Sequence, residues 1–321
     1  MSGYALYGLQ FVSDRAFAAP VPSGGVPPSF RVTFDADLPT GDWAPAEVVY
    51  QSAFQDELAQ PVVTLYRCPA GQRLHFPRAA DFYLTEGHVH CRLLPGGDPR
   101  LAEIYLLGTV LAWQREARGI PMLHAAAVGL EGGAAAFLAS NRGGKTSLAA
   151  SLVQSGGELL TDDLLAVEKA GSGWLGHPGY PQLRMWPDQA RYFAGSSEGL
   201  VRVLPDLEKL RISVDRLGGS FHSGPLPLQA LYLPERRTDS EDDGAVRIAA
   251  ASPGRSLIEL VRHSFLARMV EAAGLQPGRL ALLAKLAADV PVRTLSYPSG
   301  VQHLPAVAEA IRADLRVLTA D

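Results

Sequence analysis

The sequence has few cysteines and no long apolar run, and both absences narrow the kind of protein that it encodes. Two cysteines among 321 residues, Cys68 and Cys91, cannot build the disulfide framework of a small secreted domain. No stretch reaches eighteen uninterrupted apolar residues, and residues 1–20 lack a basic start followed by an apolar run. We therefore expect a cytoplasmic protein with no membrane partner.

An excess of positive charge is also lacking. The formal net charge is −4, so the chain has no general electrostatic attraction to nucleic acid or to anionic lipid. We expect no nucleic-acid partner. The length and the 47% hydrophobic content are sufficient for two domains with a sizeable core.

Residues 1–97 are typical of a β-rich module. Short β-type runs alternate with proline and glycine turns, and these runs cover residues 4–12, 30–34, 62–68, 82–85 and 88–94. Apolar residues then recur at helical spacing after Pro99 until Gly119, which predicts a helix between two parts of the chain. We predict an N-terminal module over 1–97 and a second domain over 98–321.

The second part begins with a pattern typical of α/β domains. Two apolar runs, 122–130 and 134–138, flank a glycine turn and predict a hairpin. A helix over 145–154 and a strand near 159–160 should follow, with another strand over 164–168. This order places the intervening loop at the carboxyl edge of a sheet.

The rest of the chain predicts further helices and one strand. Ser252 and Pro253 are typical of a capped helix start, and apolar residues at helical spacing continue to Gly274. The remaining expected elements are a helix over 278–288, a strand over 292–297, a closing helix over 304–315 and an exposed acidic loop over 239–244.

The segment from Ala139 to Thr146 has the length and the Gly-Lys-Thr ending of a phosphate-binding P-loop, with alanine where glycine usually begins it. Such a loop points backbone N–H groups and a helix N-terminus at phosphate oxygens. The residues expected to bind the nucleotide are Ser140, Asn141, Arg142, Gly143, Gly144, Lys145, Thr146 and Ser147. Lys145 would bridge the β- and γ-phosphates, and Thr146 would bind Mg²⁺. The alternative is a glycine-rich turn that binds no nucleotide.

Asp162 and Asp163 follow a short apolar strand, 17 and 18 residues beyond Lys145. Adjacent side chains at a strand end point in different directions, so one carboxylate can hold Mg²⁺ while the other faces an acceptor hydroxyl. The alternative is a solvated turn.

His124, Lys145 and the pair Asp162-Asp163 resemble, in order and spacing, the catalytic domain of bacterial HPr kinase/phosphorylase. The intervals are 21 residues from the histidine to the lysine and 17 more to the first aspartate. The resemblance covers residues 120–170 and extends more diffusely to about 310. It implies an α/β fold whose P-loop lies in a mixed sheet, as in HPr kinase and phosphoenolpyruvate carboxykinase.

The resemblance also implies site roles, with ATP and Mg²⁺ as cofactors. Lys145 would neutralise the transferred phosphate, and His124 would approach the γ-phosphate. Thr146 and Asp163 would hold the metal, while Asp162 would act as general base. The two aspartates could exchange these roles.

One signature of that family, a glutamate and an arginine before a glycine-rich apolar run, is missing. Its nearest counterpart is 182–188, where Arg184 is expected either beside the nucleotide phosphate or as a packed structural residue. Without that glutamate, a second metal and phosphorylase activity stay open. The stretch 178–188 instead resembles divergent HPr-kinase-like proteins found beside peptide-modification genes, including those of lasso peptides.

Other polar residues are expected to have no part in the site. Lys209 and Arg211 share one face of a strand and could contact ATP, but exposed surface charge is the expected role. His88, His90 and Cys91 have the chemistry of zinc ligands, yet no second cluster completes a set of four.

The favoured hypothesis is a kinase that transfers the γ-phosphoryl group of Mg-ATP to a serine or threonine hydroxyl of a peptide or small protein, including a ribosomal precursor peptide. The alternatives are a small-molecule kinase and a catalytically inactive nucleotide-binding scaffold. The acceptor, the role of the N-terminal module and a homo-oligomeric state stay open.

Overall fold

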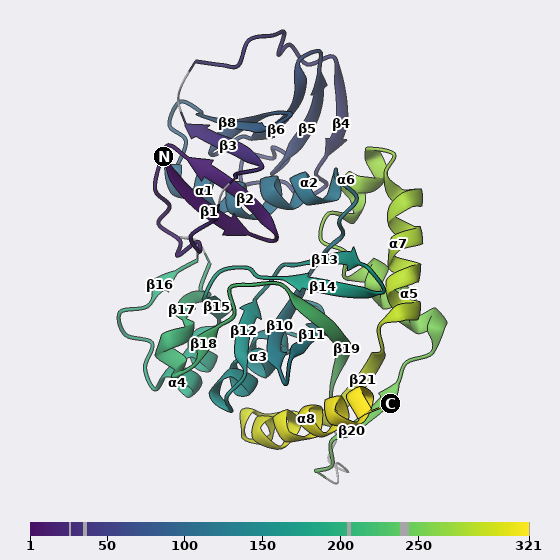
Figure 1. The fold of residues 1–321 in the computed structure, drawn as a ribbon. Coiled ribbons are helices and arrows are strands. Elements are labelled where there is room, and N and C mark those ends of the chain that lie inside the picture. Colours follow the sequence, from purple (N-terminus) through teal and green to yellow (C-terminus); the bar gives the residue numbers. More distant parts are fainter. Residues whose placement is uncertain (26, 35–36, 204–206, 238–243, 321) are drawn as a thin grey trace. The chain divides into compact units, whose positions relative to one another are not determined.

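A computed structural model describes residues 1–25, 27–34, 37–203, 207–237 and 244–320 (Figure 1). The chain forms two compact units. Unit 1 comprises Met1–Gly119 and Leu266–Arg279, and unit 2 comprises Ile120–Phe265 and Leu280–Asp321. This division differs from the boundary expected after residue 97, because the helical run that follows packs within unit 1 and a later segment returns to it.

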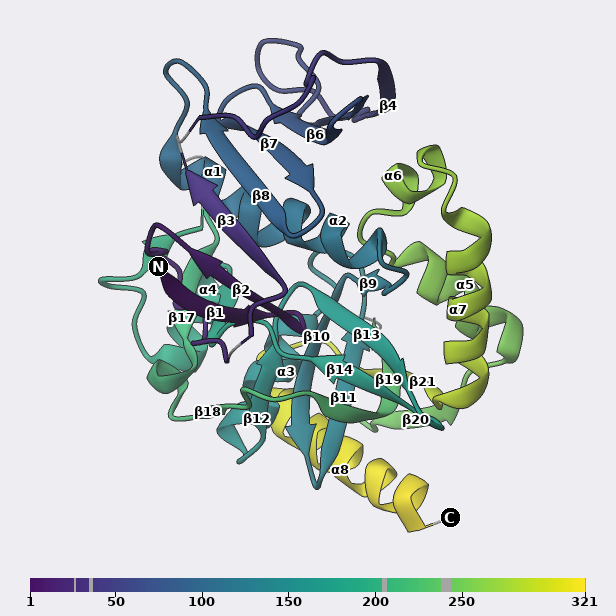
Figure 2. The same cartoon turned by 45° about the horizontal axis from the view of Figure 1, so that its top comes forward.

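Unit 1 is built on an eight-stranded sheet in the order β1-β2-β3-β8-β7-β6-β5-β4. Figure 2 shows β1, β2, β3 and β8 side by side. The strands are β1 (Ser2–Leu6), β2 (Leu9–Ser13), β3 (Phe30–Phe34), β4 (Glu47–Gln51), β5 (Thr64–Cys68), β6 (Gly71–Phe76), β7 (Ala80–Thr85) and β8 (His88–Leu93). The β-rich content expected here is confirmed, although β4 and β6 were not predicted.

The single strand expected over 4–12 is wrong, because this run is a hairpin. Tyr7 and Gly8 have φ values of 54° and 77° and form a left-handed two-residue turn between β1 and β2. The apolar run continues through the turn, so its hydrophobic pattern conceals the reversal.

The helix expected after Pro99 is confirmed and belongs to unit 1. It comprises α1 (Pro99–Tyr105), a π-helical turn η1 (Leu106–Val110) and α2 (Leu111–Glu116). The Tyr105 ring stacks on Phe76 with centroids 4.2 Å apart, and Trp113 Nε1 donates to Gln72 Oε1 over 2.8 Å. These contacts with β6 explain why unit 1 extends beyond residue 97.

Unit 2 contains a ten-stranded mixed sheet. Its main order is β18-β12-β10-β11-β19-β14-β13-β9, with β21 also beside β19 and β20 beside β21. The strands are β9 (Met122–Leu123), β10 (Ala125–Leu130), β11 (Gly133–Leu138), β12 (Glu158–Thr161), β13 (Leu165–Ala170), β14 (Gly173–His177), β18 (Ser220–Phe221), β19 (Leu226–Arg237), β20 (Arg247–Ala250) and β21 (Val292–Pro298). Because β11 pairs parallel with β19 and antiparallel with β10, the expected mixed α/β architecture is confirmed.

The predicted hairpin is confirmed as β10 and β11, which lie in the middle of this sheet. Glu131 and Gly132 take left-handed φ values of 47° and 87° at its turn. Both strands are rich in alanine and buried on both faces, as expected of central strands with packing on either side. Alternate residues therefore enter two separate cores.

Helices form each of these cores with the sheet. One core includes α3 (Lys145–Gln154), α4 (Pro187–Ala194) and α8 (Leu304–Ala320), and the other includes α5 (Pro253–Arg262) and the C-terminal part of α7 (Gln276–Asp289). A small sheet joins the first core and comprises β15 (Gln182–Met185), β16 (Val201–Arg202) and β17 (Leu210–Ser213). Two short 3₁₀ turns are η2 (Val214–Leu217) and η3 (Val301–His303).

The continuous helix expected from Pro253 to Gly274 is wrong. The chain forms α5 and then α6 (Ala267–Ala272), and the residues between them pair with β9. Ser264 forms a β-bridge with Leu123, and the Phe265 N–H donates to the Met122 carbonyl over 2.9 Å. These backbone bonds replace those of a continuous helix.

The last three predicted elements are confirmed within α7, β21 and α8. The acidic loop expected over 239–244 lies outside the described residues, except for Gly244. Among the described residues, no helix combines the length and the apolar character that spanning a bilayer requires.

Candidate functional site

The loop between β11 and α3 is compact. The Gly143 N–H donates to the Ser140 carbonyl over 2.9 Å. Arg142 and Gly144 have left-handed φ values of 63° and 96°, and α3 begins at Lys145. A chain that reverses this tightly into a helix presents the helix N-terminus at the loop.

Alanine at the first loop position fits this geometry. Ala139 is not among the described residues with positive φ, so it needs no glycine for its own backbone. Instead, Gly143 is the position in the loop where a side chain would be too close to its neighbours. A Cβ at Gly143 would lie 2.5 Å from the Ala139 Cβ and 2.9 Å from the Ser140 oxygen.

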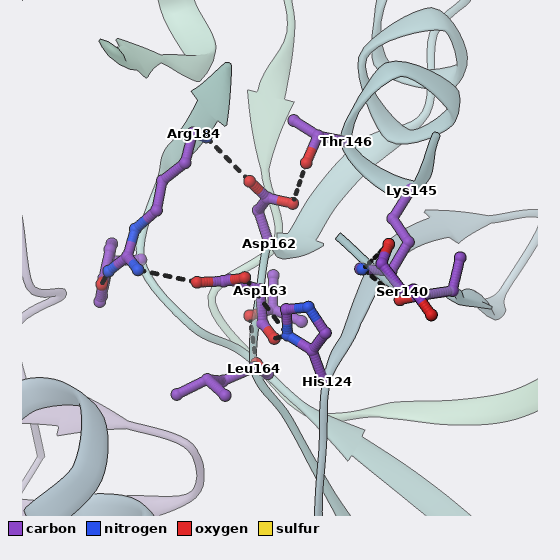
Figure 3. A network of polar contacts seen from close by, with 11 residues as sticks. His124, Ser140, Lys145, Thr146, Asp162, Asp163, Leu164 and Arg184 are labelled. Carbon is purple, nitrogen blue, oxygen red and sulfur yellow. Dashed lines mark hydrogen bonds and ion pairs between the residues drawn. The ribbon is translucent and has the colours of Figure 1, made fainter. Parts of the chain in front are cut away.

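Lys145 is folded against the loop that precedes it. Its Nζ donates to the Ala139 carbonyl and, over 3.2 Å, to the Ser140 carbonyl (Figure 3). The residue is 7% exposed, and this burial lowers the pKa of its ammonium group. The loop thus surrounds a nearly buried cation.

Asp162 follows β12 and contacts the start of α3. The Thr146 hydroxyl donates to Asp162 Oδ1 over 2.9 Å, and the Arg184 backbone N–H donates to Oδ2 over 2.8 Å (Figure 3). Burial, followed by the charge of Asp163, raises the pKa of this carboxyl group. Both of its oxygens are therefore oriented by neighbouring donors.

Asp163 points to a different set of partners. Its Oδ2 lies 2.8 Å from Arg184 Nη1, and its Oδ1 lies 3.3 Å from His124 Nδ1. Burial alone would raise the pKa of Asp163, but Arg184 and other nearby cations outweigh burial and lower it. The backbone φ of 81° is unusual for a non-glycine residue, and such strained residues cluster at functional sites.

His124 occupies the break between β9 and β10. Its Nδ1 lies 3.0 Å from the Asp163 carbonyl oxygen as well as near the Asp163 carboxylate. Two acceptors at Nδ1 favour the tautomer with the proton there, which leaves Nε2 as the acceptor. Burial lowers the pKa of the imidazole, so His124 is neutral at pH 7.

His263 is a neighbour that the sequence did not single out. Its backbone carbonyl accepts a hydrogen bond from the His124 backbone N–H over 2.7 Å, and its ring Nε2 lies 3.4 Å from Glu259 Oε2. The side chain is 7% exposed, and burial lowers its pKa to about 4. Its position depends on the break between α5 and α6, which the helical pattern did not reveal.

One small cavity, with a volume of about 30 Å³, brings most of the predicted site together. Its lining comprises Ser140, Asn141, Arg142, Gly143, Gly144, Lys145, Thr146, Ser147, Asp163, Arg184, Trp186, Gln189 and Lys209. Lys209 thus belongs to the cavity and not to an unrelated surface, contrary to expectation. Arg211 lies elsewhere, where its Nη2 donates to the Val203 carbonyl over 3.0 Å. Trp186 and Gln189 had no sequence signal beyond their closeness to Arg184.

The oxygen donors beside the loop suit a magnesium ion. Among the described residues, no three His, Cys, Asp or Glu side chains form a cluster that could hold a metal by themselves. Mg²⁺ commonly takes only one or two carboxylates, with phosphate oxygens and water completing its shell. The Thr146 hydroxyl and the Asp162 carboxylate, already 2.9 Å apart, therefore fit this ion chemically.

His88 and His90, in unit 1, both lie beside the Thr33 hydroxyl. Thr33 Oγ1 lies 2.8 Å from His88 Nε2 and 3.0 Å from His90 Nδ1. Their ring nitrogens thus take part in hydrogen bonds within the sheet of unit 1.

Comparisons with known proteins give likenesses in structure but none in sequence, and one solved structure is given as an example. No model of a known protein family matches the chain, and no curated protein is similar to it in sequence. The Hpr(Ser) kinase/phosphatase from Coxiella burnetii aligns over 62% of this chain and 99% of its own, with 12% identity and a TM-score of 0.32. A superposition this loose does not establish a shared activity.

Proposed function

We propose that the chain is an ATP-dependent kinase whose nucleotide binds at the loop Ala139–Gly144 and the start of α3. The observation that carries the proposal is the cavity in which the loop, Asp163 and Arg184 meet. Phosphoryl transfer needs phosphate binding, charge neutralisation and a carboxylate at the acceptor hydroxyl. This cavity combines groups suited to all three.

Positive groups of the cavity neutralise the phosphates. Lys145 and the backbone N–H groups of the loop bind the β- and γ-phosphates. The Arg184 guanidinium lines the same cavity and interacts with the transferred phosphoryl group. Thr146 and Asp162 would hold Mg²⁺, which would supply further charge neutralisation.

Asp163 is the proposed base. Its carboxylate lines the cavity, whereas Asp162 is bound to Thr146 and to the Arg184 backbone. These contacts favour the exchanged roles, with Asp162 on the metal side and Asp163 facing the acceptor. The acceptor oxygen bonds to the γ-phosphorus as the bond to the ADP oxygen breaks, and the hydroxyl proton passes to Asp163.

We further propose a serine or threonine hydroxyl of a peptide or small protein as the acceptor. The support is the sequence resemblance in 178–188. The same segment contributes Arg184 and Trp186 to the lining of the cavity.

The proposal is tested by incubating the protein with Mg-ATP and candidate peptides and following an 80-Da mass increase, the mass of one added phosphoryl group. Lys145→Ala should reduce transfer by about 10²-fold or more while the fold survives, because the loop loses its buried cation. Lys285→Ala, at an exposed position of α7, is the matched control. Unchanged transfer in Lys145→Ala would exclude this loop as the catalytic site. If the protein bound nucleotide but phosphorylated only small molecules, it would be a small-molecule kinase. If it bound nucleotide without any transfer, it would be a nucleotide-binding scaffold.

A further inference from the structure

A second hollow adjoins the loop cavity. It has a volume of about 480 Å³ and is lined by Arg142, Trp186, Pro187, Asp188, Gln189, Arg191, Glu208 and Arg236. Arg142, Trp186 and Gln189 line both spaces. A ligand that fills the loop cavity can therefore extend past these three side chains into the hollow.

The two spaces have different chemistry at their far ends. Asp163 and Arg184 line the loop cavity but not the hollow. A phosphate acceptor must reach Asp163, so its reacting hydroxyl cannot lie in the hollow. A nucleotide with its terminal phosphate at Asp163 instead directs its other end away from that residue.

The lining of the hollow suits an aromatic, anionic ligand. Trp186 is half-buried, and the Arg142 guanidinium carbon lies 4.6 Å from its ring centre. Gln189 supplies an amide that can both donate and accept at the edge of a base. Three arginines face two carboxylates, so the lining carries a net positive charge.

The tip of the loop is also fixed at this hollow. The Arg236 guanidinium donates to the Arg142 carbonyl, where the backbone takes its left-handed φ of 63°. This bond joins the end of β19 to the loop. Arg142 can therefore contact a phosphate through its backbone and the rest of the ligand through its side chain.

We propose that this hollow binds the nucleoside of the phosphate donor, with Trp186 and Arg142 packing against the base and Gln189 contacting its edge. The inference rests on the proposed kinase function. The volume of the hollow is within the range of about 300–1,000 Å³ typical of small-molecule sites. Aromatic stacking accepts any base, because every base has a π-face. Affinity for the base therefore comes from Trp186, and discrimination among bases comes from Gln189.

The test compares two ligands that share phosphates but differ in the nucleoside. ADP and inorganic pyrophosphate are titrated, each with Mg²⁺, against the full chain by calorimetry. Trp186→Ala should weaken ADP binding by about tenfold or more and weaken pyrophosphate binding far less. Trp186→Phe should recover most of the ADP affinity, because phenylalanine keeps an aromatic face.

Tyr192→Ala is the matched control, since Tyr192 is an exposed aromatic residue on α4 that lines neither space. It should change neither affinity. Equal weakening of ADP and pyrophosphate in Trp186→Ala, or an unchanged ADP affinity with a raised KM for the acceptor, would overturn the inference alone. Failure of the unaltered protein to bind either ligand would overturn the proposed function as well.

Discussion

Asp162 and Asp163 are adjacent in sequence, yet their carboxylates contact different parts of the site. Asp162 accepts from Thr146 at 2.9 Å, and Asp163 pairs with Arg184 at 2.8 Å. A metal ligand contributes to nucleotide binding, whereas a base matters when the acceptor loses its proton. We therefore expect Asp162→Asn to weaken Mg²⁺-dependent ATP binding. Asp163→Asn should keep ATP affinity and reduce kcat by about 10²-fold or more.

ATP affinity measured with and without Mg²⁺, together with single-turnover transfer, distinguishes the two effects. Asp215→Asn, at an exposed position of η2, is the control. The opposite pattern would restore the roles implied by the family resemblance. Full activity in both variants would remove this pair from the chemistry.

His263 predicts a particular response to acid. Its pKa is about 4 in the folded chain and 6.5 for an unperturbed histidine, so the unfolded chain binds more protons between these pH values. Stability from its neutral form is therefore present above pH 6.5 and is lost as pH falls toward 4. At 1.36 kcal/mol per pH unit, the loss is about 3 kcal/mol.

This loss should appear as a pH-dependent part of the free energy of unfolding measured by denaturant titration. Glu259, Lys145, His124 and Arg262 also influence this imidazole, so the comparison is made with His263→Gln. That variant should flatten the curve between pH 6.5 and 4. Parallel curves for His263→Gln and the unaltered chain would contradict the assignment.

At the scale of residues, the sequence predicted which groups gather but not how they pair. Spacing identified Lys145, Asp162 and Asp163, and Thr146 came from the loop motif. The bond from Thr146 to Asp162 depends on side-chain torsions that spacing does not determine. Trp186 lines the cavity directly after β15, and β15 is paired with β17, a contact between segments distant in sequence.

At the scale of elements, the loop depends on the contact between Gly143 and Ala139. A methyl group at Gly143 would lie 2.5 Å from the Ala139 Cβ, so the loop must shift to admit it. We expect Gly143→Ala to reduce nucleotide binding strongly and to destabilise the fold by about 1–3 kcal/mol, as overpacking does. Calorimetry and thermal unfolding measure the two effects.

The control for this prediction is Gly254→Ala in α5, where an added Cβ meets nothing within 4 Å. Combining Gly143→Ala with Ala139→Gly should recover part of the loss, because it removes one of the two close contacts. Additive effects of the two substitutions would show that the contact is not the cause.

The local pattern predicted some elements and failed for others. The hairpin around Gly132 and the helix α3 have strong local signals. β19 was missed because Pro227 and Pro234 argue against a strand. Pairing with β11 and β21 on either side overrides that local preference.

At the scale of the whole molecule, unit 1 is completed by a distant segment. Arg279 Nη2 lies 2.6 Å from Glu116 Oε1, and both side chains are at most 4% exposed. Removing one partner of a buried ion pair leaves the other charge without its counterion. Glu116→Ala should therefore lower the free energy of unfolding by about 3–5 kcal/mol.

Chemical denaturation followed by probes in unit 1 measures this loss. Glu271→Ala removes an exposed carboxylate from the same unit and should change stability little. Glu116→Ala combined with Arg279→Met should recover much of the loss, because the buried charge of Arg279 is removed together with that of Glu116. If Glu271→Ala lowered the free energy of unfolding as much as Glu116→Ala, the cause would be the change in net charge and not the buried ion pair.

The boundary between the units could not be read from composition. A change from β-type to helical pattern near residue 97 suggested a division there. The helical run nevertheless packs through Tyr105 on Phe76, and the later segment Leu266–Arg279 joins the same unit. Neither contact has a local signature, because both join residues far apart in sequence.

The discontinuity of unit 1 has a consequence for how the chain is made. Residues are synthesised in order, so Glu116 leaves the ribosome well before its partner Arg279. The 160 residues between Gly119 and Arg279 take roughly 8–30 s to translate at about 5–20 residues per second. During that interval the nascent unit 1 exposes the surface that α6 later covers, while the loop and β12 of unit 2 are already complete. The loop over 139–146 is therefore synthesised before unit 1 can reach its final stability.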